Sequence, residues 1–398
     1  MKPAFRLMVA GLLAVSFYSP LHVSGQTWTR TSATNANWYS IASSADGNKL
    51  FVAALSGDMH SSTNGGQTWN PTGAPNNSWG VIACSADGAT LIAATTSLEP
   101  IPGAVLLSHD FGGTWTQAPL PAYYWASVAS SADGNRLVAV GWNWPPTNLI
   151  YVSADSGASW TPTDATNAIW SGVACSADGT RLALTGSNGT WTSTNGGLNW
   201  NPAATPFAGL YVAVSGDGTT LIVLNQGSLA VSHDWGANWI TNSTMPAQTW
   251  PGTPRVASSV DGSLLAALPS GTTFDIEAML STNAGLTWSN SQVGLCVYTN
   301  AGSIASSADG GKLAMAMGQC GIFTFATHPA PVLTIASSAD NIVLSWIVPS
   351  QNFVLQKSSD LSTWSTVGVT PVLNYTNLHY EVTVSRTSGQ SFYRLASP

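Results

Sequence analysis

An all-β fold built from repeated four-stranded units is predicted by three features of this sequence. An eight-residue pattern, Ser-x-Asp/Asn-x-Gly-x-Thr/Ser/Asn-Trp, recurs six times, at residues 62–69, 108–115, 153–160, 193–200, 232–239 and 281–288. A second pattern, Ser-Ala-Asp-Gly with small variations, recurs seven times at intervals of 39–48 residues. Of the 398 residues, 38 are Gly, 18 are Trp and only 7% are charged. This composition suits short hairpins between apolar strands.

The first 25 residues have the features of a secretory signal. Lys2 and Arg6 give a positive start, residues 7–17 form an apolar core, and the small residues 23–25 provide a cleavage site. We therefore expect an exported protein that is secreted, periplasmic or at the cell surface. No later segment is long and apolar enough to span a bilayer, so we expect no membrane insertion after signal removal.

The second repeat illustrates how one unit forms a sheet. Residues 79–85 suit an innermost strand, 90–94 return as the second, 104–108 form the third, and 114–116 open the fourth. The repeat interval is the length of a propeller blade. In the longer pattern the Asp or Asn accepts hydrogen bonds from its own turn, the Gly supplies a positive φ, and the Trp covers the hairpin. We therefore expect structural turn residues at Asp46, Asp87, Asp133 and Asp178 in the shorter pattern and at Asp110, Asp155, Asn195 and Asp234 in the longer one.

The shorter pattern occurs seven times and the longer one six times, and this difference indicates how the first and last repeats meet. Residues 25–30 resemble the tail of a longer pattern whose front half is missing, and residues 321–325 form a third strand with no fourth strand after it. If 26–30 pair with 321–325, the first and last units close one ring and leave no sheet edge open. The sequence therefore predicts a seven-bladed β-propeller over residues 26–328, closed by the mature N-terminal strand.

The remaining chain predicts a second, smaller module. Residues 329–332 are a Pro-containing linker, and strand-like runs follow at 342–346, 353–356, 380–384 and 392–395. We expect residues 333–398 to form a small C-terminal β-sandwich that is fibronectin-III-like in kind.

The four cysteines form two groups. Cys84 and Cys175 precede equivalent turns in non-adjacent units, so we expect small buried residues that are too far apart to bridge. Cys296 and Cys320 flank one hairpin of the last unit and can form a disulfide in an oxidising compartment, with two free thiols as the alternative.

The longer patterns resemble the Asp-box, or BNR, repeat of sialidases, two-propeller xyloglucanases, sortilin-type receptors and Ycf48-type photosystem II assembly factors. The resemblance covers nearly all of residues 26–328 and implies a propeller, but hydrolases and non-enzymes share these hairpins. A sialidase-like site implies three arginines that grip a carboxylate. The propeller contains only Arg30, Arg136, Arg181 and Arg255, and we expect Arg136 and Arg181 to be solvated turn charges. Sialidase activity is therefore not expected.

Blade connectivity places both repeated turns on one face, so we expect function on the opposite face. The irregular loops there carry Glu99, Trp142, Trp144, Asp275 and Glu277, and the blade-to-blade loops add Tyr123, Tyr124, Asp164, Trp250 and Arg255. Of these, we predict ligand binding at Trp142, Trp144, Tyr123, Tyr124, Glu99, Asp275, Glu277 and Arg255. Trp38, Trp79, Trp125 and Trp170 recur eight residues before a turn Asp. We expect them to pack between adjacent blades.

A glycoside hydrolase is the alternative function. Glycosidases need two carboxylates that flank the scissile bond, and outside the repeated turns the propeller offers only Asp58, Glu99, Asp164, Asp275 and Glu277. We assign no catalytic residue, and keep a xyloglucanase-like enzyme as an alternative. The histidines lack metal-site spacing, so we expect neither a metal nor a cofactor.

Charge restricts the class of partner. A net charge of −7 with only 11 Lys and Arg argues against nucleic acid, whose phosphates require clustered cations. The sequence therefore predicts an exported, monomeric, non-catalytic propeller that binds an extracellular protein or glycan on the face opposite the Asp-box turns. A structural surface or matrix protein is a further alternative.

Overall fold

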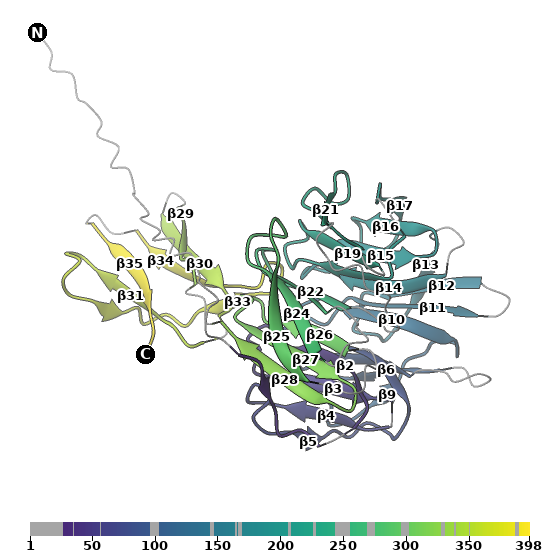
Figure 1. Ribbon diagram of the computed structural model, residues 1–398. Helices are drawn as coiled ribbons and strands as arrows, with labels where there is room; N and C mark the ends of the chain where they lie inside the picture. Colours follow the sequence, from purple (N-terminus) through teal and green to yellow (C-terminus); the bar gives the residue numbers. More distant parts are fainter. Residues whose placement is uncertain are drawn as a thin grey trace, which may run out of the picture.

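The computed structural model describes residues 27–34, 36–55, 57–95, 103–143, 147–163, 165, 169–205, 208–225, 228–242, 255–268, 275–295, 302–327, 331–337, 340–349, 351–386 and 390–398. These residues contain no helix, and their strands form eight four-stranded sheets and one three-stranded sheet (Figure 1). Neighbouring strands pair antiparallel. No helix suited to crossing a membrane occurs in the described ranges. The predicted signal, residues 1–25, lies outside them.

Seven of the four-stranded sheets lie between residues 29 and 326. The first six are β2 (Trp38–Ser43), β3 (Leu50–Ala54), β4 (Met59–Ser62) and β5 (Asn70–Pro71); β6 (Trp79–Cys84), β7 (Leu91–Thr95), β8 (Val105–Ser108) and β9 (Thr116–Gln117); β10 (Tyr124–Ser130), β11 (Leu137–Asn143), β12 (Thr147–Ser153) and β13 (Thr161–Thr163); β14 (Trp170–Cys175), β15 (Leu182–Gly186), β16 (Gly189–Ser193) and β17 (Asn201–Pro202); β18 (Tyr211–Val214), β19 (Leu221–Asn225), β20 (Ser228–Ser232) and β21 (Ile240–Asn242); and β22 (Arg255–Ser258), β23 (Leu265–Leu268), β24 (Asp275–Ser281) and β25 (Ser289–Leu295). The seventh contains β26 (Gly302–Ser306), β27 (Lys312–Met317), β28 (Gly321–Ala326) and β1 (Thr29–Arg30).

The first strands of the seven sheets form a closed cycle. Each contacts its successor, and β26 contacts β2. A cycle of backbone hydrogen bonds also joins the turns that follow these strands, starting with Ala45 N–H to Ala86 O at 2.8 Å and returning with Ala308 N–H to Ala45 O at 2.7 Å. In the sixth sheet Val260 occupies the position of Ala45, and in the fifth sheet Gly216 occupies the same position. A Cβ atom on Gly216 would collide with the Val260 side chain, so the larger residue requires a glycine beside it.

The closing strand comes from the start of the described chain. Thr29 lies opposite Thr324 and Arg30 opposite Phe323. The Trp28 side chain is only 7% exposed, its ring centroid is 5.1 Å from that of Phe325, and its indole N–H donates to Ser291 Oγ at 3.0 Å. Thr29 and Arg30 thus pair where the sequence predicts, and Trp28 occupies the place of a pattern Trp.

Tryptophans fill the spaces between neighbouring sheets. Trp38, Trp79, Trp125 and Trp170 are at most 6% exposed, and each joins an apolar cluster with residues of the preceding sheet. The prediction that these side chains pack between adjacent units is therefore confirmed.

Basic residues after the shorter turns join one sheet to the next. Arg181 Nη1 donates to Gly218 O at 2.9 Å, and Lys49 Nζ donates to Asp87 O at 2.7 Å. The aliphatic stem of Arg136 packs against Gly179 in the same way. The prediction of solvated turn charges for Arg136 and Arg181 is therefore wrong, because the next turn along the cycle lies within reach of each side chain.

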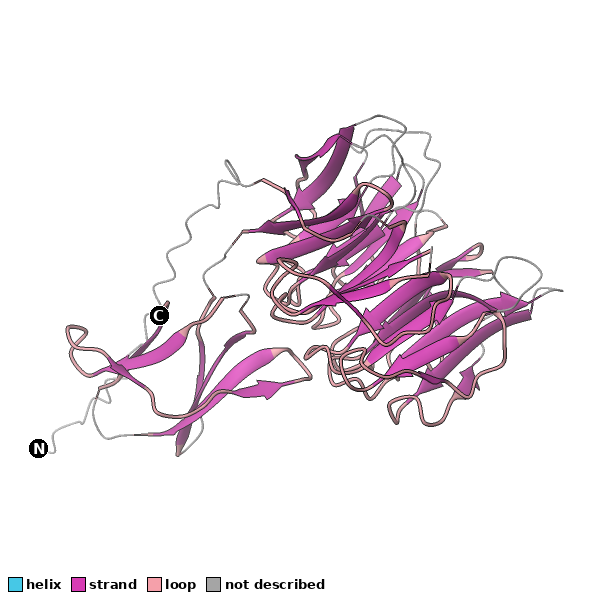
Figure 2. Ribbon diagram, turned by 90° about the horizontal axis from the view of Figure 1, so that it is seen from below, coloured by secondary structure: helices cyan, strands magenta, loops and turns pink. Residues whose placement is uncertain are grey.

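The C-terminal module, residues 331–398, has two sheets. One contains β29 (Thr334–Ser337), β30 (Asn341–Ile347), β34 (His379–Ser385) and β33 (Val372–Asn374), and the other β32 (Ser365–Thr366), β31 (Val354–Ser358) and β35 (Phe392–Ala396). Leu344, Trp346 and Val382 of the first sheet share an apolar core with Leu355 of the second. Figure 2 shows the module beside the cycle of sheets.

Candidate functional site

The Ser and the Asp or Asn of the eight-residue pattern are occupied by bonds within their own turns. In the turn at 108–115, Ser108 Oγ donates to Asp110 Oδ1 at 2.8 Å, and the Thr114 backbone N–H donates to the same oxygen at 2.8 Å. The Trp115 indole N–H donates to Gly112 O at 3.0 Å. Asn195 takes the Asp role in its own turn, accepting from Ser193 Oγ at 2.9 Å.

These bonds also change the acidity of the turn carboxyls. The Thr114 N–H and hydroxyl lower the pKa of Asp110 to about 2, and Asn238 lowers the pKa of Asp234 to about 2 in the same way. The pKa of Asp155 is lowered by the hydroxyl and N–H of Ser159. Their carboxylates are therefore held as hydrogen-bond acceptors, which suits a structural role.

The shorter turns have the same character. Burial acts to raise the pKa of the Asp46 carboxyl, but hydrogen bonds from Ser44 and Asn48 outweigh it, so the pKa lies below its ordinary value. The Ser and Asp residues of Ser85 to Asp87, Ser131 to Asp133 and Ser176 to Asp178 bond to each other at 2.5–2.6 Å.

The C-terminal module covers the central end of the turn-bearing face. Ala45, Val260 and Ala308 of the turns form one buried cluster with Val348, and Leu378 packs against it. Leu378 also lines a cavity of about 170 Å³ with Ser43, Cys84 and equivalent residues of the other units. This face is thus partly occupied by the protein's own chain.

The two free thiols near the shorter turns are held in their protonated form. Cys84 and Cys175 are free, and burial followed by the nearby turn carboxylates raises the pKa of each to about 12. The Cys84 thiol donates to Ser43 O at 3.2 Å. Cys320 is disulfide-bonded, and its predicted partner, Cys296, lies outside the described residues.

An aromatic cluster lies at the opposite end of the third sheet. Tyr124 and Trp142 are cross-strand partners on β10 and β11, and their half-buried rings stack with centroids 4.5 Å apart and an interplanar angle of 19°. Tyr123 lies edge-on to Trp125 at 5.9 Å. The structure therefore brings together two of the predicted binding residues, Tyr124 and Trp142, whereas Tyr123 packs against the core between the second and third sheets.

Arg255 lies at the same end of another sheet, as the first residue of β22. Its guanidinium carbon is 4.8 Å from the Tyr211 ring centroid and 5.6 Å from that of Tyr39. Sequence reasoning named Arg255 but missed Tyr39 and Tyr211. The only feature of the sequence that could have indicated this contact is that Tyr39, Tyr211 and Arg255 all lie near the start of an innermost strand.

The predicted acidic residues do not form a pair in the described structure. Glu277 accepts a hydrogen bond from Asn290 Nδ2 at 3.0 Å on the exposed outer part of its sheet. Asp275 begins β24, but its side chain is not described, and Glu99, Trp144, Asp164 and Trp250 lie outside the described residues. Among the residues that are described, no group of three potential ligands could hold a metal ion.

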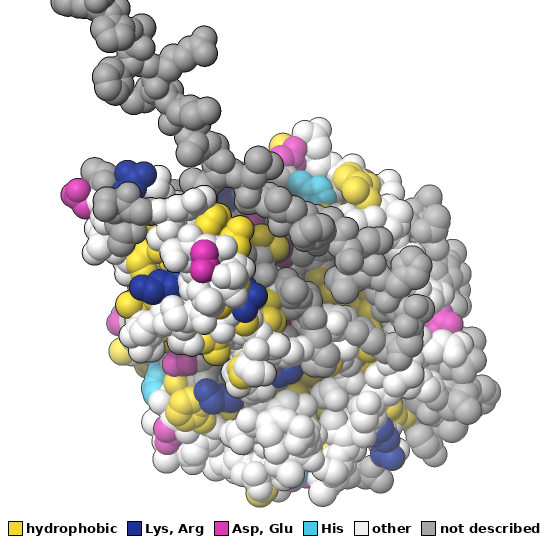
Figure 3. Space-filling model, turned by 90° about the vertical axis from the view of Figure 1, so that its left-hand side faces the viewer, with side chains coloured by type: hydrophobic (Ala, Val, Ile, Leu, Met, Phe, Trp, Pro, Cys, Tyr) yellow, Lys and Arg dark blue, Asp and Glu magenta, His cyan; other side chains and the backbone are white. Residues whose placement is uncertain are grey.

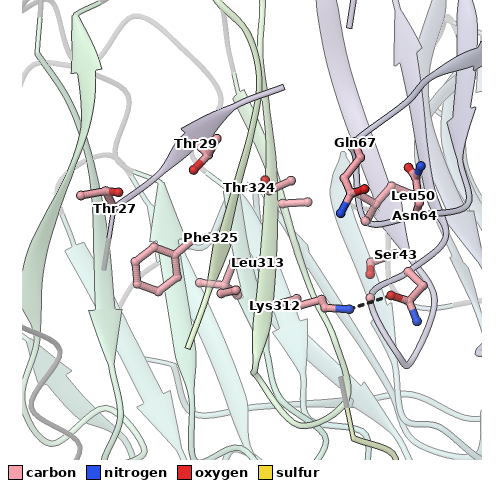
Figure 4. A pocket seen from close by; sticks show the side chains of 15 residues that line it. Thr27, Thr29, Ser43, Leu50, Asn64, Gln67, Lys312, Leu313, Thr324 and Phe325 are labelled. Atoms are coloured by element: carbon pink, nitrogen blue, oxygen red, sulfur yellow. Dashed lines mark hydrogen bonds between the residues drawn. The ribbon is translucent and has the colours of Figure 1, made fainter. Parts of the chain in front are cut away.

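A second cavity, of about 440 Å³, lies between the seventh and first sheets (Figure 4). It is lined by Thr27, Thr324, Phe325 and residues of the first sheet, at the gap left by the missing seventh turn. Lys312 Nζ crosses the gap and donates to Asn48 Oδ1 at 2.6 Å. Because this ammonium already has a partner within the protein, it is not a free group for a ligand. We therefore attribute the cavity to the way the N-terminal strand closes the cycle of sheets without a seventh long turn.

The C-terminal module contains a shortened form of the repeated turn that the sequence reasoning also missed. Ser358 Oγ donates to Asp360 Oδ1 at 3.0 Å, and the Trp364 indole N–H donates to Leu361 O at 3.3 Å. One residue fewer separates the Asp from the Trp, which hid the pattern. Figure 3, viewed from the side of this module, shows charged side chains scattered over the surface.

Comparisons with known proteins agree with this geometry at the level of fold. No family model matches the chain, and no curated protein matches its sequence. Among solved structures, YCF48 bound to D1 peptide matches with a TM-score of 0.54 and 18% identity, over 78% of this chain and 96% of the other. YCF48 from Cyanidioschyzon merolae matches with a TM-score of 0.55 and 17% identity, over 75% and 98%. An ancestral GH74 enzyme matches with a TM-score of 0.55 and 13% identity, over 81% of this chain but only 53% of the enzyme. The chain therefore has an all-β, propeller-like fold.

Proposed function

We propose that the protein is an exported, non-catalytic binding protein. Residues 26–328 would form a single seven-bladed Asp-box propeller closed by the mature N-terminal strand, residues 329–332 a linker, and residues 333–398 a fibronectin-III-like sandwich. The protein would act as a monomer outside the cytoplasm, without a cofactor or nucleic acid. Its ligand, a protein or a glycan, would bind on the face opposite the Asp-box turns.

The stacked pair of Tyr124 and Trp142 is the observation that carries this proposal. Aromatic rings provide a large, rigid contact surface for sugar rings or apolar side chains, and such residues often dominate binding energy. The pair is partly exposed, whereas the turn Asp residues on the other face are engaged in their own turns. The likeness to YCF48 bound to D1 peptide supports a binding role for this kind of fold.

Loss of the partly exposed Trp142 ring tests the proposal. A glycan array and a pull-down from extracellular proteins would first identify a ligand of the wild-type protein. Trp142→Ala should then weaken its binding by about 10-fold or more, since truncation of an aromatic residue at the centre of a contact surface typically costs about 2 kcal/mol. Trp144→Ala tests the neighbouring loop, and Trp364→Ala, in the C-terminal module, is the control. Unchanged binding by Trp142→Ala would contradict the site.

A glycoside hydrolase is the second candidate, favoured by the likeness to an ancestral GH74 enzyme. Catalysis would require Glu99, Asp275 or Glu277 to lie within about 5–10 Å of another carboxyl group in one cleft. Hydrolysis of a polysaccharide that is abolished by Glu277→Gln or Asp275→Asn would establish it. If neither binding nor hydrolysis is found, a structural surface or matrix role becomes the better explanation.

A further inference from the structure

The guanidinium of Arg255 occupies the central space of the cycle of sheets. Arg255 belongs to β22, whereas Tyr39 belongs to β2. In the cycle, β26 lies between these two strands and contacts both. Since the Arg255 guanidinium nevertheless lies over the Tyr39 ring, at 5.6 Å, it reaches across the space that the innermost strands enclose.

Its position along the axis is also defined. Arg255 and Tyr211 are the first residues of their strands, and Tyr39 is the second residue of β2. The turns on which the C-terminal module rests follow the other ends of the same strands. The cluster of Arg255, Tyr39 and Tyr211 therefore lies at the end of the central space that the module leaves uncovered.

Among the residues that the structure describes, no anionic group pairs with this cation. The Arg255 Nε atom is buried and has no hydrogen-bond partner within those residues. Although Arg255 as a whole is only half-buried, burial of a polar donor without a partner is unfavourable. The two tyrosine rings compensate in part through cation–π contacts, with centroids 4.8 and 5.6 Å from the guanidinium carbon. The N–H donors of the guanidinium lie in the plane of the group, where they match the two oxygens of a carboxylate.

We propose that Arg255, flanked by Tyr39 and Tyr211, is a binding site for a carboxylate group of the ligand. The inference rests on the proposed function, because the site lies on the face assigned to ligand binding. It adds the chemical class of the ligand: one that presents a carboxylate to the end of the central space. Uronic acids and peptide chain ends both supply such a group.

Acetate is the minimal probe, and acetamide is its neutral counterpart of similar shape. Titrated into the full-length protein at constant ionic strength, acetate should shift the Arg255 Nε–H signal in proton–nitrogen NMR spectra and raise the thermal midpoint, because a ligand that binds only the folded state stabilises it. Acetamide should do neither. Equal effects of the two probes, or no shift with acetate, would overturn the proposal without the need for any variant.

Two variants test the residue itself. Arg255→Gln should weaken acetate binding by about 10- to 100-fold, the factor that corresponds to loss of charged hydrogen bonds worth about 1.5–3 kcal/mol. Arg255→Lys keeps the charge but loses the planar pair of donors, and should give an intermediate affinity. Arg394→Gln is the matched control, because Arg394 also lies over an aromatic ring, Trp364, at 4.2 Å, but in the C-terminal module. Undiminished acetate binding by Arg255→Gln would assign Arg255 a purely structural role.

The same variants separate this inference from the proposed function. If the natural ligand depends on Trp142 but not on Arg255, the binding face stands and the carboxylate site fails. If it depends on neither, both fail. Glucuronate represents a uronic acid, and N-acetylglycine represents the end of a peptide chain. The compound that resembles the natural ligand should bind the wild-type protein more tightly than acetate, and Arg255→Gln should remove this difference.

Discussion

Replacement of Trp28 by Ala should destabilise the protein at the point where its two chain segments meet. A buried aromatic side chain removes about 150–250 Å² from water, which at about 25 cal/mol per Å² corresponds to roughly 4–6 kcal/mol. Trp28 is 7% exposed and donates one hydrogen bond to Ser291. Since measured Trp-to-Ala losses in protein cores are about 3–5 kcal/mol, we expect a loss of about 4 kcal/mol, or a thermal midpoint about 5 °C lower.

Calorimetry and urea unfolding would measure this loss, and amide hydrogen exchange would locate it. Exchange should increase in β28, whose outer neighbour is the N-terminal strand, and remain slow in β8, whose outer neighbour is joined to it by a hairpin. Trp28→Phe should retain most of the stability, and Trp364→Ala in the C-terminal module should cost less than about 1 kcal/mol. A loss below about 1 kcal/mol for Trp28→Ala, or unchanged exchange in β28, would refute the role of Trp28 in closure.

Two further predictions concern the turns and the module. The hydrogen bonds of its turn lower the pKa of Asp110 from 3.8 to about 2, so the stability that its carboxylate contributes is complete above pH 3.8 and is lost as the pH falls through 2. Asp110→Asn copies the natural Asn195 turn and should fold normally, but urea unfolding should show a smaller loss of stability than in the wild type between pH 5 and pH 2. Equal losses in the two proteins would contradict this role. Leu378→Asp should weaken docking of the C-terminal module by about 1–2 kcal/mol because a half-buried apolar contact is lost, which small-angle scattering would detect as a larger radius of gyration. Leu361→Asp, at a position that is 57% exposed in the same module, is the control and should leave the scattering unchanged; identical curves for all three proteins would rule out the docking contact.

The repeated sheets were predictable because their signals are local. Each turn is stabilised by bonds between residues no more than five apart, such as Ser108 with Asp110 or Lys49 with Ser44. Seven copies of one pattern against six of the other were enough to place residues 28–30 beside β28. The predicted strands of the second repeat also coincide closely with β6–β9.

The candidate site was only partly predictable. Tyr124 and Trp142 could be placed on one face from the connectivity of a single sheet, and the structure adds that their rings stack. Arg255 could be placed on that face as well, but Tyr39 is more than 200 residues away in the sequence and belongs to a sheet that is not its neighbour. Nothing in the sequence near Arg255 indicates which rings it meets.

The sequence by itself determined the repeated unit, the number of turns of each kind and the segment that pairs with the last sheet, because turn hydrogen bonds and the alternation of apolar residues act over a few residues. Only the tertiary structure decided that Arg255 crosses the central space to Tyr39, that the basic residues after the turns bond to the next sheet, and that Leu378 of the C-terminal module lies against Ala45, Val260 and Ala308. These contacts depend on the curvature accumulated over all the sheets and on the space left when the cycle closes. Neither quantity is a property of any one segment.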